Sequence, residues 1–213
     1  MEGYTSEREQ VDAIKQWWQA NGKSIVLGLA VGLAGLGGYR YWDGMQNANA
    51  ENASINYEQF LNLAAQGSGK EAIETGTAIL KAYPDSSYAR LTGLLLAKLE
   101  VDDGKLDDAK THLQWVIDHA DSAEVAAIAK ARMAQVVLAG GDAEAALKLF
   151  EQIGATDGEQ FAELKGDILA RLGRRDEAVK AYAQAQKLVA DAGADARLIE
   201  LKIEALGLDP TAK

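Results

Sequence analysis

Apolar residues recur at spacings of three and four along most of the chain. Leu91, Leu94 and Leu95 are one example, and the residues between such positions are mostly polar or charged. This spacing is typical of helices that bury one face, whereas a half-buried strand would alternate strictly, and no such β-branched run occurs. The pattern therefore predicts an all-α fold. The same spacing appears in Tyr57/Phe60/Leu61, Met133/Val136/Val137 and Leu164/Ile168/Leu172.

One segment departs from this amphipathic pattern. From Ser24 to Tyr39 the chain has 16 residues without a charge, which as a helix would be about 24 Å long. The hydrocarbon core of a bilayer is roughly 30 Å thick. The flanking Lys23 and Arg40 compensate for the difference, because their apolar stems can follow the helix while their charges reach water. The segment therefore predicts a transmembrane helix over residues 24–42.

Aromatic residues gather at both ends of the predicted span. Trp17 and Trp18 precede it, and Tyr41 and Trp42 close it, so that three of the four tryptophans lie at its ends. Aromatic belts of this kind mark the two interfaces of a membrane with water. We expect these four residues, together with the two flanking basic residues, to anchor the helix at the interfaces.

Small residues are spaced regularly along the same segment. Gly28 and Gly32 form a GxxxG pair, and Ala34 and Gly38 continue a small-xxx-small pattern. Such spacing lets another helix approach closely inside a membrane, where glycine is tolerated better than in a soluble helix. We therefore expect a helix–helix contact at these four positions. The alternative is that they reflect only how common small residues are in membrane helices.

Two alternatives to an uncleaved span remain. A cleaved signal peptide would agree with the apolar run and with an A-x-A sequence at Ala48 and Ala50. However, the residues before the run are electrically neutral, and the A-x-A lies further beyond it than cleavage sites usually do. The other alternative is a buried helix of a soluble domain.

The basic residues near the span predict its orientation. Three of them precede the span, and only Arg40 lies close behind it. Because basic residues favour the cytoplasmic side, we expect residues 1–23 to form a cytosolic tail and residues 43–213 to lie outside the cytoplasm. Residues 4–20 within the tail have the pattern of a short amphipathic helix. The three preceding basic residues are Arg8, Lys15 and Lys23.

Four stretches of the remaining chain align without gaps, and each begins with a glycine. Their starts lie 37, 37 and 32 residues apart, and an alanine follows each glycine by five residues. Glycine can end a helix in a left-handed turn, and acids behind it suit the first turn of the next helix. The small alanine would let the two helices pack closely. The glycines are Gly67, Gly104, Gly141 and Gly173, and the alanines are Ala72, Ala109, Ala146 and Ala178.

This pattern resembles the tetratricopeptide type, in which pairs of antiparallel helices repeat about every 34 residues. The resemblance covers roughly residues 50–190. It is degenerate, since the early tryptophan is absent and glycine at the packing position of the first helix occurs once, as Gly166. Pro84 would end the second helix of the first repeat, and a helix over 195–206 would cap the stack. We therefore predict a single transmembrane helix followed by a degenerate tetratricopeptide-like helical-hairpin solenoid.

Charge and composition narrow the classes of partner. The net charge is −10, and residues 1–42 contain four acids and four bases, so the whole excess lies in residues 43–213. An acidic domain repels phosphate, which argues against binding of nucleic acid. The chain has no cysteine, which excludes disulfides, thiolate metal sites and thiol catalysis.

The sequence offers no constellation of residues for catalysis. His112 and His119 are the only histidines, and on one predicted helix they would lie about 10 Å apart, too far for one metal ion. We interpret them as surface histidines, with metal binding by the acids near His112 as the alternative. No phosphate-binding loop or nucleophile motif occurs. We expect no enzyme, cofactor, metal or small-molecule substrate, but protein binding in the groove of a helical solenoid. Candidate groove contacts, with core positions as the alternative, are Tyr83, Tyr88, Phe161 and Tyr182.

The whole chain resembles the YfgM family, the ancillary subunits of the SecYEG translocon of Gram-negative bacteria. The most specific parts are the leader VDAIKQWWQANGK (residues 11–23) and the segment GYRYW (residues 38–42). The resemblance implies a protein of the inner membrane with a periplasmic domain and no catalytic residues. It further implies partnership with SecYEG and PpiD, and a link to periplasmic chaperones or exported client chains. An envelope scaffold unrelated to export and a secreted, cleaved protein are the other hypotheses.

Overall fold

The computed structural model describes residues 7–154 and 158–207, and within these ranges every regular element is a helix, with no strand. The all-α prediction is therefore confirmed. The chain divides into two compact units, Met1–Glu51 and Asn52–Lys213, here called the N-terminal unit and the repeat unit. The helices are α1 (Glu7–Ala65), α2 (Gly69–Ala82), α3 (Ser87–Asp102), α4 (Leu106–Asp118), α5 (Ala123–Ala139), α6 (Ala143–Glu151), α7 (Glu159–Arg171), α8 (Arg175–Asp191) and α9 (Arg197–Ala205).

Helix α1 does not end near residue 20. The prediction of a separate short helix over residues 4–20 is therefore wrong for its described part, while residues 4–6 lie outside the described residues. Asn21 does not break the helix, since its Nδ2 donates to the carbonyl of Trp17 at 3.0 Å, within the same helical turn. The first proline of the chain is Pro84, so no residue of α1 lacks the N–H that the helical ladder needs.

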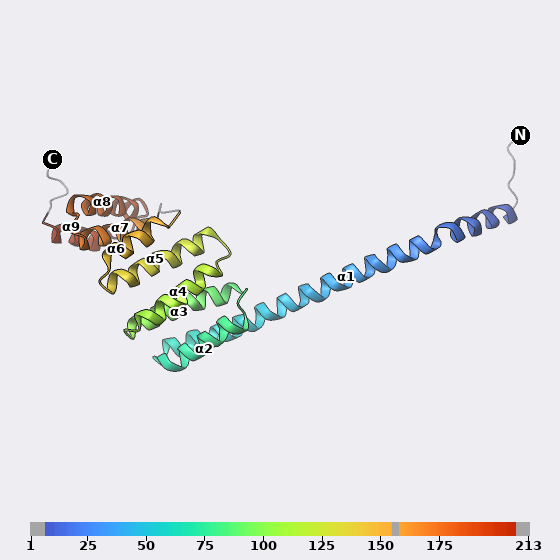
Figure 1. Ribbon diagram of the computed structural model, residues 1–213, viewed down its shortest axis with the longest axis horizontal. Coiled ribbons are helices and arrows are strands. Elements are labelled where there is room, and N and C mark those ends of the chain that lie inside the picture. Colours follow the sequence, from blue (N-terminus) through green and yellow to red (C-terminus); the bar gives the residue numbers. More distant parts are fainter. Residues whose placement is uncertain (1–6, 155–157, 208–213) are drawn as a thin grey trace, which may run out of the picture. The chain divides into compact units, whose positions relative to one another are not determined.

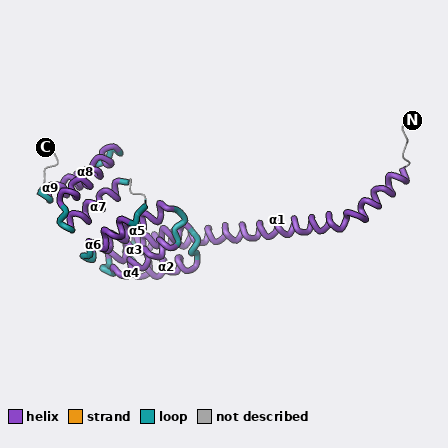
Figure 2. The backbone as a smooth tube through the Cα atoms, turned by 45° about the horizontal axis from the view of Figure 1, so that its top comes forward, coloured by secondary structure: helices purple, strands orange, loops and turns teal. Residues whose placement is uncertain are grey.

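The repeat unit consists of helical hairpins that follow one another in a stack, joined by short loops (Figures 1 and 2). The four repeat glycines lie between the two helices of successive hairpins and have φ values from 75° to 94°. This is the left-handed turn predicted from the sequence. At Gly104 the glycine N–H donates to the carbonyl of Val101, and the next N–H, of Lys105, donates to Glu100. These two bonds satisfy the last carbonyls of α3, as in a Schellman motif.

The four repeat alanines are completely buried. Each lies in the first turns of the second helix of its hairpin, where its small side chain allows the first helix to come close. The larger residues further along these helices are also buried and fill the space behind the alanine. These are Leu113, Phe150 and Tyr182 at nine residues after the glycine, and Ile79, Val116 and Ile153 at twelve.

Two glycines of first helices permit close approach of the second helix. A Cβ at Gly166 would overlap the ring of Tyr182, and a Cβ at Gly93 would lie 2.5 Å from Cγ2 of Val116. Gly166 remains the one glycine at the consensus packing position, and Gly93 is a second close approach that the consensus does not predict. Gly93 serves the same purpose about one helical turn earlier in its helix, where a search for the regular consensus position does not find it.

The core of the repeat unit is divided along the stack. Each buried cluster joins one hairpin to the first helix of the next, such as the cluster of Leu94, Leu113 and Met133 from α3, α4 and α5. The last cluster joins α7 and α8 to Ile199 and Ile203 of α9. Helix α9 thus covers the apolar end of the final hairpin, as terminal elements of repeat proteins must.

Candidate interaction surfaces

The apolar part of α1 is exposed. Within the described residues, one helical stretch, Gln10–Tyr41, is long and apolar enough to cross a membrane, and only 6% of its apolar window is buried. A core helix of a soluble domain would be mostly buried, so the exposure argues against that alternative. Leu27 and Leu29, for example, expose 66% and 63% of their surface.

The predicted interface anchors lie at the two ends of the uncharged run within this stretch, residues 24–39. The tryptophans at its start expose more than half of their surface, and Tyr41 at its end is exposed as well. The side chain of Trp42 lies outside the described side chains. Their role at membrane interfaces stays a prediction. The described anchors are Trp17, Trp18, Lys23, Arg40 and Tyr41, all exposed.

The four small residues of the predicted helix contact do not share one face of α1. Successive residues of an α-helix are about 100° apart, so Gly28 and Gly32 lie together, while Ala34 and Gly38 lie about 120° around the helix from them. Gly35 falls on the face of the GxxxG pair. A Cβ at any of these glycines would meet no atom within 4 Å. The geometry thus offers two separate small-residue faces, and the GxxxG face is the longer one.

A groove lies in the repeat unit between α3 and α5. It has a volume of about 400 Å³, and its walls are formed mainly by aliphatic side chains from both helices and from α4. Three longer polar side chains, those of Lys98, Arg132 and Gln135, also line it and are exposed. The apolar lining residues are Leu94, Ala97, Val101, Leu113, Val136 and Ala139.

A second hollow follows between α5 and α7 and is reached by Tyr182 of α8. Gln135 and Ala139 line both hollows, so the two are neighbours along the same side of α5. Asp167 of this hollow accepts from the hydroxyl of Tyr182 at 2.7 Å and from Nζ of Lys202 at 2.7 Å. Its carboxylate is therefore already paired within the fold.

The Lys202 ammonium links α9 to α7. It also lies 2.6 Å from Oε1 of Glu163. Burial lowers the pKa of Lys202, but hydrogen bonds to Asp167 and Glu163 outweigh burial and raise the pKa above its ordinary value. Burial, followed by the hydrogen bond to Asp167, raises the pKa of Tyr182. The cluster is a structural clamp on the capping helix.

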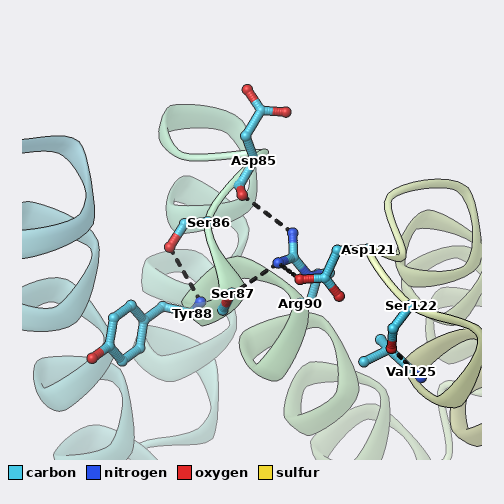
Figure 3. A network of polar contacts seen from close by, with 8 residues as sticks. All are labelled: Asp85, Ser86, Ser87, Tyr88, Arg90, Asp121, Ser122 and Val125. Carbon is cyan, nitrogen blue, oxygen red and sulfur yellow. Dashed lines mark hydrogen bonds and ion pairs between the residues drawn. The ribbon is translucent and has the colours of Figure 1, made fainter. Parts of the chain in front are cut away.

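A buried arginine joins the start of α3 to the loop before α5 (Figure 3). Arg90 of α3 is 6% exposed, and it donates to the carbonyl of Asp85 at 3.2 Å and to Oγ of Ser87 at 3.0 Å. Its guanidinium also pairs with Asp121, in the loop before α5. Ser86 and Ser122 cap the starts of α3 and α5. Arg90 therefore ties together the beginnings of the two helices that form the groove.

The two histidines lie in different environments. His119 is exposed and stacks on Trp115 with ring centroids 4.1 Å apart. The prediction of a surface position is wrong for His112, whose side chain is 16% exposed and whose Nδ1 lies 2.8 Å from Oε2 of Glu100. Glu100 is only 2% exposed, and burial raises the pKa of its carboxyl, an effect that the His112 contact partly offsets. Among the described residues no three His, Asp or Glu side chains are placed to hold a metal ion.

The candidate aromatic contacts separate into two pairs. Phe161 and Tyr182 are buried in the core, which was the stated alternative, whereas Tyr83 and Tyr88 are half-buried. Neither Arg132 nor Glu100 was among the predicted site residues. Burial of Glu100 could have been predicted, because this acid lies at a core position of the α3 apolar spacing, four residues after Leu96.

Comparison with known proteins extends these findings. The family model of the tetratricopeptide repeat-like domain matches residues 15–208. An ancillary SecYEG translocon subunit of Escherichia coli is 30% identical over 85% of this chain and 88% of that protein. Another, from Aggregatibacter actinomycetemcomitans, is 30% identical over 95% of this chain and 99% of that protein. A third, from Neisseria gonorrhoeae, is 25% identical over 97% and 100%.

Solved structures support the fold of the repeat unit. The MamA RS-1 ArsTM double mutant aligns with a TM-score of 0.54 at 15% identity, over 73% of this chain and 94% of that one. MamA 41-end from Desulfovibrio magneticus RS-1 aligns with a TM-score of 0.53 at 13% identity, over 73% and 93%. At such identities the likeness concerns the fold alone. Together with the family-model match, the apolar helix and the hairpin stack confirm the predicted tetratricopeptide-like architecture. The extent of the sequence matches shows that the chain belongs to the family of ancillary SecYEG translocon subunits, the YfgM family.

Proposed function

We propose that this protein is an ancillary subunit of the Sec translocon in the bacterial inner membrane, where it acts by binding other proteins. The observation that carries the proposal is the match to translocon subunits over nearly the whole chain, including the apolar helix as well as the repeats. A membrane anchor and a binding domain in one chain would hold a partner close to the translocon exit. The repeat unit carries grooves lined by apolar and polar side chains, which supports binding of other proteins.

The proposed topology has one span. Residues 1–23 form the cytosolic tail, residues 24–42 cross the membrane, and residues 43–213 lie in the periplasm. In this arrangement the repeat unit works with PpiD and links the translocon to periplasmic chaperones or to exported chains as they emerge. The support is the excess of basic residues before the span.

The topology can be tested with single cysteines, because the chain has none of its own. Asp12→Cys and Ala183→Cys introduce a thiol at exposed positions of the N-terminal unit and the repeat unit. In spheroplasts, a membrane-impermeant maleimide should label the thiol at position 183 at once and the thiol at position 12 only after lysis. The reverse order of labelling would overturn the proposed orientation.

The partnership can be tested by affinity purification from native membranes in mild detergent. SecY and PpiD should be recovered with the wild-type chain, and the double variant Gly28→Leu/Gly32→Leu should recover less. Gly37→Leu is a matched control, since residue 37 lies about 180° around the helix from Gly28. Recovery of envelope-scaffold components without SecY would refute the proposal and favour a scaffold function. A mature chain that begins after Ala50 would refute the anchor.

A further inference from the structure

The groove between α3 and α5 combines apolar walls with two cationic side chains, those of Lys98 and Arg132, which are here called the mouth of the groove. Leu94 and Val136, on opposite walls, are 8% and 5% exposed, so the floor of the groove is already packed. The remaining volume of about 400 Å³ exceeds that of one aliphatic side chain and its backbone. An apolar side chain of a partner would be removed from water there, which is the main source of affinity in such grooves.

Arg132 is the cation of the mouth that has no carboxylate partner. Its Nη1 donates to the carbonyl of Leu94 at 3.1 Å, which holds the guanidinium over the α3 wall. Among the described residues no carboxylate is recorded within 4.0 Å of it, whereas Lys98, the other cation that lines this groove, is paired with Asp102. Surrounding protein atoms lower the pKa of Arg132 through burial alone. The guanidinium has five N–H donors, so it can still receive an anion in bidentate geometry.

The second cation of the mouth, Lys98, is weakly held. Its Nζ lies 2.9 Å from Oδ2 of Asp102, but the side chains are 64% and 60% exposed. An ion pair of this kind contributes little and is easily exchanged for another partner. The mouth therefore carries two positive groups and one negative group in a chain of net charge −10. This local excess of positive charge, against the sign of the rest of the domain, specifies the charge of the occupant.

We propose that the α3–α5 groove binds a partner polypeptide through a segment in which aliphatic side chains are flanked by side-chain carboxylates. The aliphatic group fills the space between Leu94 and Val136, and a neighbouring carboxylate pairs with Arg132. This inference deepens the proposed function, on which it rests, by naming the chemistry of the partner. It excludes basic segments, because they would place a positive charge against two others.

The inference can be tested with the full chain in detergent micelles and four fluorescent dodecapeptides. All four are acetylated and amidated, so that only side-chain charges differ. Three carry two central leucines flanked by glutamate, serine or lysine, and the fourth keeps the glutamates but has serine in place of leucine. Fluorescence anisotropy should rank the glutamate–leucine peptide first, about tenfold tighter than the lysine–leucine or the leucine-free peptide.

Variants assign the preference to the groove. Arg132→Gln should reduce the glutamate-over-serine ratio to about one, and Arg132→Lys should keep part of it. Arg175→Gln removes the same charge from an exposed position outside the groove and should leave the ratio unchanged. Ala139→Phe should weaken the leucine peptides by obstructing the groove, whereas Ala183→Phe, on an exposed face of α8, should not. Circular dichroism confirms that each variant is folded.

Two results would overturn the inference. One is equal binding, or no binding, of all four peptides by the wild-type chain. The other is a glutamate preference that persists in folded Arg132→Gln. Recovery of SecY with the same variants separates this inference from the proposed function. If SecY is recovered while the peptides show no preference, the groove assignment fails and the translocon role stands. If the preference is present and SecY is never recovered, the translocon role fails.

Discussion

The N-terminal unit and the repeat unit use the same residue types in opposite environments. Leu27 of the first exposes 66% of its surface, whereas Leu96 of the second is completely buried. A Cβ added at Gly28 would meet nothing within 4 Å, while one added at Gly93 would lie 2.5 Å from Val116. In the repeat unit, glycine and alanine let two helices of the same chain approach each other. In the N-terminal unit, the same small residues lie on an open helix surface.

The partner of a small residue decides the effect of replacing that residue. Where the partner is a second helix of the same chain, replacement lowers the free energy of unfolding. Where the surface is open, replacement leaves the fold intact and can change only contacts with other molecules or with lipid. Substitutions at positions of the two kinds should therefore differ widely in their effect on the free energy of unfolding.

The largest effect is expected from Gly93→Val. The added methyl groups have no space beside Val116, so α3 and α4 must separate, and overpacking of this kind destabilises by about 3 kcal/mol. Urea unfolding of the full chain in micelles, followed by circular dichroism, measures the change. Gly69→Val is the control, because a Cβ at Gly69 meets nothing within 4 Å. Equal destabilisation by both substitutions would contradict the packing argument.

The second effect concerns the buried pair of Glu100 and His112. His112→Ala leaves the carboxylate of Glu100 without its partner, at an expected loss of about 2 kcal/mol near neutral pH. His119→Ala is the control at the C-terminal end of the same helix, since His119 is exposed. A loss in both variants of the same size would show that the buried pair is not the cause.

The pH dependence of the His112→Ala loss has a defined sign. The pKa of Glu100 is raised above 4.5 in the fold by burial, and the His112 contact only partly offsets this, so removal of His112 raises the pKa further. A group with a raised pKa contributes most to stability below its unfolded pKa, and this contribution is lost as pH rises through the folded pKa. The destabilisation of His112→Ala should therefore shrink as pH falls from 7 towards 4.5. A loss of stability in His112→Ala that does not depend on pH would contradict this prediction.

The third effect concerns the clamp on α9. Lys202→Met removes the ammonium that joins Asp167 and Glu163, with an expected loss of about 1 kcal/mol confined to the last hairpin and the cap. Hydrogen exchange should accelerate in α9 and not in α3. Because the folded pKa of Lys202 is raised above 10.5, the wild-type contribution is present below that pH and is lost above it. Faster exchange throughout the repeat unit would contradict a local clamp.

Regular repetition explains which features could be predicted from the sequence. The turns at Gly67, Gly104, Gly141 and Gly173 and the alanines behind them depend on spacing within one hairpin, which the sequence displays directly. Apolarity without charge likewise identifies the exposed stretch of α1. What the sequence does not display is which polar residue meets which across helices. Arg132 looks like other charged residues until α5 is placed beside α3, because the Leu94 carbonyl that it meets is 38 residues away. Glu100 lies at a core position of the α3 pattern, but that pattern does not show that its partner is His112, 12 residues away on α4.

The smallest effect on stability is expected from Gly28→Leu/Gly32→Leu. Because a Cβ at either position meets no atom within 4 Å, the urea midpoint of the repeat unit should stay unchanged, and the added leucines favour the helix slightly, by less than about 1 kcal/mol per residue. The same variant should nevertheless recover less SecY, whereas the main effect of Gly93→Val should be a lower free energy of unfolding. A change in the urea midpoint comparable with that of Gly93→Val would mean that the GxxxG face packs on a partner within the chain. Small residues of the N-terminal unit would then serve packing within the chain, as they do in the repeat unit.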